Sequence, residues 1–350
     1  MSTPKYRKSI TKKIIKLIET EYDIQIHETE QLFLGADKDS YVYKVKLGNN
    51  KTCFLKIRTG LFIEPSVTIP YILYNALLPQ KTNRHIIEPI KTSKGNLFFK
   101  MEDCTVILYP FITGQSGIQR DLAETQWIEL GKLLYQIHNF KWPPDTASPE
   151  ALGISWEKFG DEWVSSLANY MKELETRRVD NNYEKQFINL LVSRKKFMND
   201  IIARTEELVS QIKTMELKYC ICHADLHAAN IFISDDNNFF IVDWDTLIFA
   251  PKERDLMFIG GGVANKWNKR EEEELFYRGY GEYDKVNRAI LSYYRYVRII
   301  EDMVVYYDEF FADNANEKNQ LSIIETVEST FMPGNVVDIA FKTDPLLYPD

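Results

Sequence analysis

The chain has 350 residues, a length that suits two domains or one large unit with two lobes. Its composition, 45% hydrophobic and 27% charged, is that of an ordinary globular protein and excludes a fibrous or an intrinsically disordered chain. The four cysteines are too few and too scattered for a disulfide scaffold, and no apolar run reaches the roughly 18 residues of a membrane span. We therefore expect a cytoplasmic protein with reduced cysteines and no membrane partner.

Charge is distributed unevenly along the sequence. Residues 1–60 carry 12 Lys and Arg against 7 Asp and Glu, a net charge of +5, whereas residues 251–350 carry 12 against 19, a net charge of −7. A nucleic-acid-binding protein needs positive charge over most of its surface, so we expect no nucleic-acid partner. The pattern suits a protein that binds an anion near its beginning and a cationic small molecule near its end. No protein partner is indicated.

The first part of the chain predicts an antiparallel sheet with one inserted helix. An amphipathic helix around residues 10–18 comes first, capped by Ser9 or Thr11. The dipeptide Glu64-Pro65 predicts the start of the inserted helix, which runs to about residue 78, because proline is favoured at the first helical position. The expected strands are 31–34, 41–47, 53–57, 86–92, 96–101 and 105–109.

After the segment 113–117 the pattern becomes mostly helical. The expected helices are 126–138, 161–175, 182–213, 270–280, 284–311 and 322–330, and the expected strands among them are 219–222, 231–233 and 239–242. The sequence thus predicts an α+β fold with two lobes. An N-terminal lobe with an antiparallel sheet, one helix and a hinge spans 1–112, and a larger, mainly α-helical lobe spans 113–350.

Most of the chemically interesting side chains lie in two short segments near the expected middle strands. Asp225 follows one strand, Asn230 lies five residues later, and Asp243 ends another strand 18 residues beyond Asp225. This D-x-x-x-x-N spacing with a strand-terminal aspartate is used where Mg²⁺ is held beside a hydroxyl nucleophile. Carboxylate and amide oxygens suit Mg²⁺, so Asn230 and Asp243 can bind the metal while Asp225 accepts the proton of the nucleophile.

This arrangement of a metal site beside a proton acceptor indicates a kinase. A kinase also needs phosphate-binding and adenine-binding groups, which should lie earlier in the chain. Lys56 is the lone cation in the apolar strand 53–57, which suits a phosphate-binding lysine, and Glu64 is the one acidic residue between Ile57 and Ile87 that can pair with it. The loop 35–40 offers backbone amides and the Ser40 hydroxyl to phosphate oxygens. The last strand of the first lobe runs into Pro110-Phe111-Ile112, where a hinge would pair with adenine.

Other ionisable residues have simpler interpretations. His223 is expected to brace its loop by hydrogen bonds, and Cys220 with Cys222 are expected to be buried thiols rather than zinc ligands. Glu301 and Asp302 lie among apolar residues of a long helix, where acidic groups need a partner. That partner is Arg295 or Arg298, or else a bound cationic substrate.

Two segments, HADLHAAN at 223–230 and IVDWD at 241–245, resemble the signature of the aminoglycoside phosphotransferase and choline kinase family, which has the protein-kinase fold. The segments 250–262, 266–268 and 335–341 resemble the spectinomycin phosphotransferase branch of that family, and the likeness covers nearly the whole chain. The resemblance implies an ATP- and Mg²⁺-dependent kinase that phosphorylates a hydroxyl group of an aminocyclitol antibiotic, with spectinomycin as the favoured acceptor and antibiotic resistance as the outcome.

The resemblance also implies roles for individual residues. Asp225 would be the catalytic base, Asn230 and Asp243 the magnesium ligands, and Lys56 the phosphate clamp held by Glu64.

The Pro110 carbonyl and the Ile112 amide would bind adenine, and Asp255 would anchor the catalytic loop. A cationic acceptor would lie against Asp225, Asp245 and one or both of Glu301 and Asp302.

Three alternatives remain open. The first is a kinase whose acceptor is a different hydroxylated metabolite, such as choline, homoserine or a sugar, because one fold can serve many substrates. The second alternative is a metal-dependent hydrolase, since His223-x-Asp225-x-His227 also resembles a metal-binding cluster, although it leaves Lys56, Glu64 and Asn230 unexplained. The third is a relative that binds nucleotide without catalysis.

Overall fold

The structure is a computed structural model. It describes residues 12–33, 39–59, 64–77, 79, 81–101, 104–142, 148, 150–160, 162–174, 176–179, 181–281, 283–312 and 315–346. The expected caps Ser9 and Thr11 and residues 35–38 of the expected phosphate loop lie outside this range. Among the described residues, no helix combines the length and the apolar character needed to cross a membrane.

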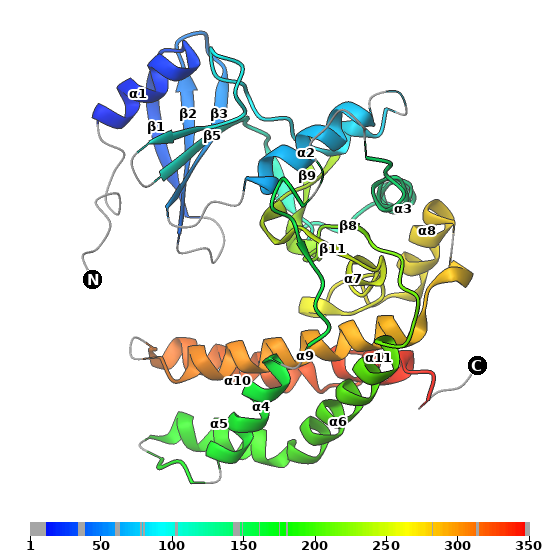
Figure 1. Cartoon of the computed structure of the whole chain (residues 1–350). Coiled ribbons are helices and arrows are strands. Elements are labelled where there is room, and N and C mark those ends of the chain that lie inside the picture. Colours follow the sequence, from blue (N-terminus) through cyan, green and yellow to red (C-terminus); the bar gives the residue numbers. More distant parts are fainter. Residues whose placement is uncertain are drawn as a thin grey trace. The chain divides into compact units, whose positions relative to one another are not determined.

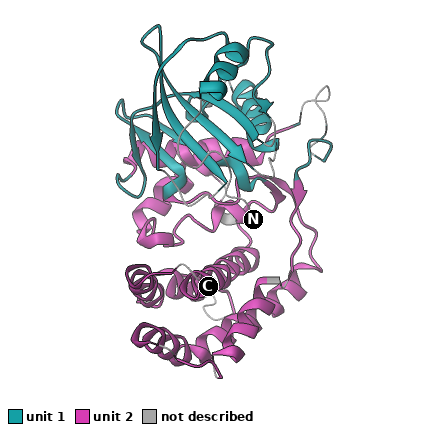
Figure 2. Cartoon of the chain, turned by 90° about the vertical axis from the view of Figure 1, so that its left-hand side faces the viewer, with its two compact units in different colours: residues 1–121, 142–154, 229–247 teal, residues 122–141, 155–228, 248–350 magenta. Residues whose placement is uncertain are grey.

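The chain forms two compact units, coloured separately in Figure 2. The first comprises residues 1–121, 142–154 and 229–247, and the second comprises residues 122–141, 155–228 and 248–350. The units therefore do not follow a single cut in the chain near residue 112. The segment 229–247 groups with the first unit because one of its strands pairs with residues 114–116.

The first unit contains a five-stranded antiparallel sheet in the order β1-β2-β3-β5-β4, seen in Figure 1 with its neighbouring helix α1. The elements are α1 (Lys12–Tyr22), β1 (Ile26–Leu32), β2 (Ser40–Leu47), β3 (Thr52–Thr59), α2 (Pro65–Ala76), β4 (Phe99–Met101) and β5 (Cys104–Pro110). Apolar residues at alternate positions of the strands, including Val45, Leu55 and Val106, pack with Ile14 and Ile18 of α1 into one core. The other side chains of β3, Lys56 among them, therefore point to the opposite face.

A small second sheet completes this unit. Its strands are β6 (Gly114–Ser116), β9 (Ile231–Ser234) and β10 (Phe239–Ile241), in the order β10-β9-β6. The strand expected at 86–92 is wrong: this segment forms a single bridge, between Ile86 and Ile241, and its hydrogen bond from the Ile90 amide to the Leu108 carbonyl is not continued into a ladder. Pro89, between them, has no amide proton with which to continue a ladder.

The second unit is mainly helical, with one small sheet in the order β7-β11-β8. Its strands are β7 (Ser155–Trp156), β8 (Cys220–Cys222) and β11 (Ile248–Ala250). Its helices are α3 (Glu124–His138), α4 (Glu162–Glu173), α5 (Asn182–Ser193), α6 (Lys195–Ile212), α7 (Glu253–Leu256), α8 (Arg270–Tyr280), α9 (Arg288–Phe310), α10 (Glu317–Thr330) and α11 (Val336–Thr343).

Helix α9 is the central element of the second unit, with more than half of its residues buried against α4, α6, α7, α10 and α11. The single helix expected over 182–213 is wrong, because the helix is interrupted at Arg194, whose φ of −99° ends α5 before α6 begins.

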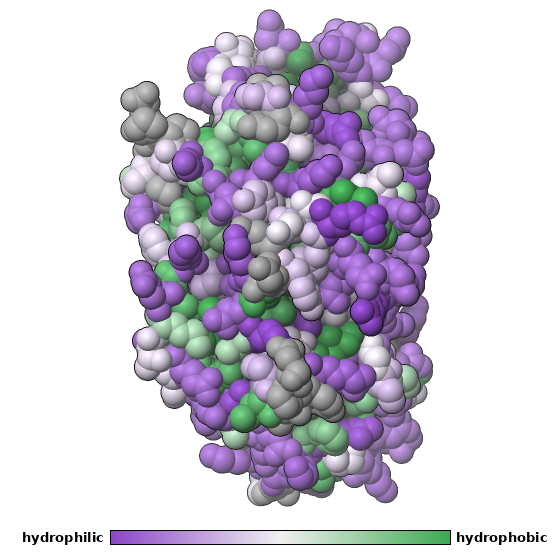
Figure 3. Space-filling model, turned by 90° about the vertical axis from the view of Figure 1, so that its right-hand side faces the viewer, coloured by the Kyte–Doolittle hydropathy of each residue, from purple (hydrophilic) through white to green (hydrophobic). Residues whose placement is uncertain are grey.

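On the face shown in Figure 3, hydrophilic residues predominate and hydrophobic ones form small separate patches.

Candidate active site

Lys56 lies beside two carboxylates of the first unit. Its Nζ is 3.0 Å from Oδ2 of Asp245 and 3.9 Å from Oδ1 of Asp243. Arg58, two residues later on the same face of β3, also donates a hydrogen bond to Oδ2 of Asp245. Burial would raise the pKa of Asp245, but Lys56, Arg58 and the Ser66 hydroxyl outweigh it and hold that pKa below its ordinary value. Asp245 is therefore an ionised group shared by two cations.

Glu64, the expected partner of Lys56, is the residue just before α2. Within the described part of the chain, no ion pair joins Glu64 to Lys56, because the Lys56 ammonium is bound by Asp245 instead. Ser40 begins β2 and lies opposite Arg58 in the ladder.

Pro110 and Ile112 lie where β5 ends. The Phe111 amide between them donates a hydrogen bond to the Thr52 carbonyl, at 3.2 Å. A cavity of about 670 Å³ borders both residues, and its remaining walls come from Tyr74, Arg84, Ile86–Lys91 and Phe240. Lys56 and Asp243 do not line this cavity, so it is distinct from the group of charges around Asp245.

Asn230 and Asp243 lie at the same end of the β9–β10 hairpin. Asn230 directly precedes β9, Asp243 follows β10 by two residues, and Ile231 pairs with Ile241 at this end. The Val242 amide donates to the Asn230 carbonyl at 3.0 Å, which fixes the two segments beside each other. Asp243 has a left-handed backbone (φ 62°) and a side chain that is 54% exposed. An amide and a carboxylate on adjacent strand ends are a donor set that fits Mg²⁺.

The loop that carries Asp225 is held by Asp255 of the second unit, as expected from the sequence. Asp255 is fully buried, and its two oxygens accept hydrogen bonds from the amides of His223, at 3.0 Å, and Ala224, at 2.7 Å. His138 Nε2 lies 3.0 Å from Oδ2 of Asp255. Burial would raise the pKa of Asp255, but the hydrogen bond to His138 and the charges around it hold that pKa below its ordinary value.

Asp225 itself is half-buried between two basic side chains of the second unit. Arg298 Nη1 lies 3.1 Å from Oδ1, and His227 Nε2 lies 3.3 Å from Oδ2. Burial would raise the pKa of Asp225, but His227 and Arg298 outweigh it and hold that pKa well below its ordinary value. His223 braces the loop as expected, because its Nδ1 accepts a hydrogen bond from the Asp225 amide at 3.3 Å.

The two candidate acidic residues of α9, Glu301 and Asp302, differ in their partners. Asp302 forms an ion pair with Arg298, with Nε and Oδ1 3.0 Å apart, so its partner belongs to its own helix. Burial raises the pKa of Asp302 above its ordinary value. Arg295, the other expected partner, instead donates to the carbonyls of Met257 and Ile259. Glu301 is half-buried and adds negative charge near Arg298.

The metal-dependent hydrolase is disfavoured by this arrangement. Among the described residues, the one group of three histidine, cysteine or acidic side chains close enough to share an ion is His138, Cys220 and Cys222. His223, Asp225 and His227 do not form such a group, and Arg298 places a positive charge beside Asp225. A metal ion at Asp225 would have to displace the ion pair with Arg298.

The roles of two arginines are not evident from the sequence. Arg58 has the signal of alternation, since it shares the face of Lys56, but its partner lies 187 residues away. Arg298 is an expected partner of Asp302, yet its bond to Asp225 spans 73 residues and has no sequence signal.

Comparison with known proteins shows the family to which the chain belongs. Residues 34–294 match the model of the phosphotransferase enzyme family. A crystal structure of spectinomycin phosphotransferase in complex with ADP and spectinomycin is similar at 32% identity, with a TM-score of 0.82, over 96% of this chain and 99% of that one. No curated protein matches the chain significantly.

A more distant structure is similar in fold. The aminoglycoside phosphotransferase of Alicyclobacillus acidocaldarius subsp. acidocaldarius has 11% identity and a TM-score of 0.67 over 97% of each chain. The expected protein-kinase-like α+β fold is thereby confirmed. The chain belongs to the phosphotransferase enzyme family and is a phosphotransferase with an alcohol group as acceptor.

Proposed function

We propose that the chain transfers the γ-phosphoryl group of ATP to a hydroxyl group of an aminocyclitol antibiotic, and that spectinomycin is the acceptor. The observation that carries this proposal is the similarity, over almost the full length of both chains, to a spectinomycin phosphotransferase solved with ADP and spectinomycin. The expected consequence in a cell is resistance to spectinomycin.

The first unit supplies the groups for the nucleotide. Lys56 and Arg58 are two cations on one face of β3, and in this structure both contact Asp245. When triphosphate binds, Lys56 holds its oxygens while Asp245 keeps the ammonium in position. Asp245 thus takes the role expected for Glu64, and Asp245 serves the nucleotide rather than the acceptor.

The adenine and metal groups follow from the same unit. The Pro110 carbonyl and the Ile112 amide bind the adenine edge, and the Ser40 hydroxyl contacts a phosphate oxygen. Asn230 and Asp243 hold Mg²⁺, since they supply hard oxygen donors at one end of the β9–β10 hairpin. Bound there, Mg²⁺ would supply positive charge that offsets the charge developing on the phosphates.

Asp225, in the second unit, accepts the proton of the acceptor hydroxyl. Its low pKa keeps it ionised at neutral pH, so its function is to orient the hydroxyl and to take the proton late in the transfer. Arg298 and His227 hold the carboxylate in one orientation. Because Arg298 already neutralises Asp302, Glu301 is the better remaining candidate on α9 for an amino group of the acceptor.

The proposal is tested with purified protein, Mg-ATP and a panel of hydroxylated amines. We expect spectinomycin-dependent release of ADP and a product heavier than spectinomycin by one phosphoryl group. Asp225→Asn should bind ATP normally but turn over at least about a hundredfold more slowly, the usual scale for loss of a positioned base. Expression of the wild type, and not of Asp225→Asn, should raise the tolerated dose of spectinomycin in a susceptible host.

Two results would contradict the proposal at different levels. Turnover with choline, homoserine or a neutral sugar, and none with spectinomycin, would show that the acceptor is wrong and the chemistry right. Wild-type turnover by Asp225→Asn at saturating substrates would show that Asp225 is not the base.

A further inference from the structure

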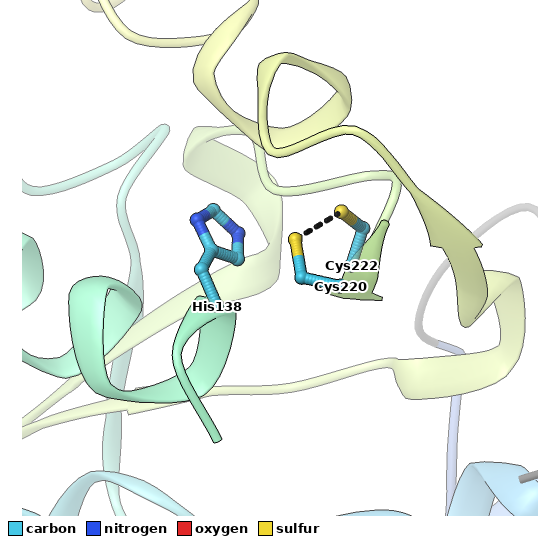
Figure 4. A group of neighbouring side chains, drawn as sticks. All are labelled: His138, Cys220 and Cys222. Carbon is cyan, nitrogen blue, oxygen red and sulfur yellow. Dashed lines mark hydrogen bonds between the residues drawn. The ribbon is translucent and has the colours of Figure 1, made fainter. Parts of the chain in front are cut away.

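Two cysteines lie immediately before the loop that carries Asp225. Cys220 and Cys222 flank Ile221 in β8, and their sulfur atoms point to the same side of the strand, 3.7 Å apart (Figure 4). The thiol of each is also within 3.6 Å of the Ala250 carbonyl on the paired strand β11. Cys222 is fully buried, whereas Cys220 is partly exposed.

His138 lies beside this pair, and the three side chains could be taken for a metal site. Both ring nitrogens of His138 are already hydrogen-bonded, Nδ1 to the Tyr280 hydroxyl at 2.8 Å and Nε2 to Asp255 at 3.0 Å. A metal ion would have to displace one of these bonds, and structural zinc sites use four ligands rather than three. The geometry therefore favours chemistry of the two sulfur atoms over metal binding.

The two thiols are not equivalent. The hydrogen bond from the Cys222 thiol and the neighbouring His138 lower the pKa of Cys220, whereas burial raises that of Cys222. The more acidic and more accessible thiol is the one that reacts first with an oxidant, and a second thiol in contact then resolves the product.

We propose that Cys220 and Cys222 form a reversible disulfide on exposure to a peroxide, and that this oxidation slows phosphoryl transfer. The Cys220 thiolate attacks a peroxide oxygen, the O–O bond breaks, and the leaving hydroxide becomes water with the proton that Cys220 released. The Cys222 sulfur then attacks the sulfenic sulfur of Cys220, the S–S bond forms, and the S–O bond breaks to release a second water. Two thiols and one hydrogen peroxide thus give one disulfide and two waters.

The link to activity is mechanical and rests on the proposed role of Asp225. Residues two apart in an extended strand have Cα atoms about 6.6 Å apart. Disulfides span about 4.4–6.8 Å, so this spacing is near their upper limit and the bond would pull β8 out of its extended shape. The next residues, His223 and Ala224, bind Asp255 through their amides at 3.0 and 2.7 Å. Distortion of β8 therefore weakens these bonds and displaces Asp225.

The bond is tested by peptide mass spectrometry on full-length reduced protein treated with hydrogen peroxide. We expect the peptide that contains both cysteines to lose two hydrogen atoms and to regain them with dithiothreitol. Cys220→Ser and Cys222→Ser should each prevent this change. Cys53→Ser/Cys104→Ser is the matched control, because those cysteines are buried in the first unit and should leave the reaction intact.

The link to the loop is tested by two further readouts. Oxidation should increase hydrogen exchange at the amides of His223 and Ala224 and should slow acceptor-dependent turnover, and dithiothreitol should reverse both. Hydrogen exchange reports on the loop even if spectinomycin is not the acceptor, so failure of the proposed substrate is distinguishable from failure of this inference. Absence of the disulfide, or a disulfide with unchanged exchange and turnover, would overturn the inference. So would retention of one zinc ion by wild type and by neither serine variant, which would identify a metal centre.

Discussion

At the scale of single residues, two non-glycine positions beside the candidate chemistry have left-handed backbones. Ala224 has φ 68° and Asp243 has φ 62°. For a residue with a Cβ atom this conformation costs about 1 kcal/mol, and it persists only where other contacts fix it. At Ala224 the fixing contact is the hydrogen bond from its amide to buried Asp255.

Ala224 provides a direct test of this strain. Ala224→Gly should be as stable as the wild type or more stable by up to about 1 kcal/mol, because glycine adopts positive φ without steric cost. Ala224→Val should be destabilised and should lose activity, because a β-branched side chain fits this conformation poorly. Urea unfolding and steady-state turnover measure both effects. If valine is tolerated as well as glycine, the loop does not depend on this backbone geometry.

Substitution of Asp245 tests whether this residue serves the nucleotide or the acceptor. Because its carboxylate contacts Lys56 and Arg58, Asp245→Asn should raise the KM for ATP and lower kcat while changing the KM for the acceptor little. Loss of a charged partner costs about 1.5–3 kcal/mol, which corresponds to a change in kcat/KM for ATP of roughly tenfold to more than a hundredfold. Glu301→Gln serves as the comparison, since it should affect the acceptor more than ATP. The reverse pattern would place Asp245 with the acceptor.

At the scale of elements, the sequence predicted what local patterns determine. Alternation identified β3, and helical periodicity identified α3, α8 and α9. The short strands β6 and β11 were missed because three residues are too few to show a period, and their partners, β9 and β8, determine them. The break at Arg194 was missed because it involves neither glycine nor proline.

The candidate site likewise contains residues that a local sequence pattern predicts and residues that it does not. The spacing of Asp225, Asn230 and Asp243 is local, so the sequence alone suggested it. The ion pairs of Arg58 and Arg298 join residues far apart in the chain, and tertiary packing alone brings them together.

The contact between α3 and α8 rests on two glycines. A Cβ atom at Gly131 would lie 2.1 Å from the Phe276 carbonyl oxygen, and one at Gly279 would lie 2.0 Å from that of Ile128. Gly131→Ala and Gly279→Ala should each destabilise the second unit by about 1–3 kcal/mol, although alanine favours a helix by about 1 kcal/mol. Lys132→Ala, an exposed position on α3, is the control and should be neutral or stabilising. Thermal unfolding of the three variants measures the difference. Equal stability of Gly131→Ala and Lys132→Ala would mean that α3 and α8 can move apart without loss of stability.

At the scale of the whole chain, the last helices of the second unit are held by a buried ion pair. Arg204 of α6 donates two hydrogen bonds to Asp344, at 2.7 and 2.8 Å, and the Tyr296 hydroxyl of α9 donates a third at 3.0 Å. Asp344 is fully buried. One carboxylate just after α11 thus joins segments that are 140 residues apart.

Asp344→Asn should therefore destabilise the second unit by about 3 kcal/mol at neutral pH, since it leaves the Arg204 charge without its principal buried partner. Burial would raise the pKa of Asp344, but the bonds from Arg204 hold it below its ordinary value. A carboxyl with a lowered folded pKa contributes stability above its unfolded pKa, about 3.9, and loses it as the pH falls further. The difference between the variant and the wild type should accordingly shrink below about pH 4. Asp200→Asn removes the exposed pair with Lys196 on the same helix, which is worth at most about 1 kcal/mol. Urea unfolding at pH 7 and near pH 3 measures both variants. Equal destabilisation by the two at pH 7 would show that burial of the Arg204–Asp344 pair is not what holds α11 in the second unit.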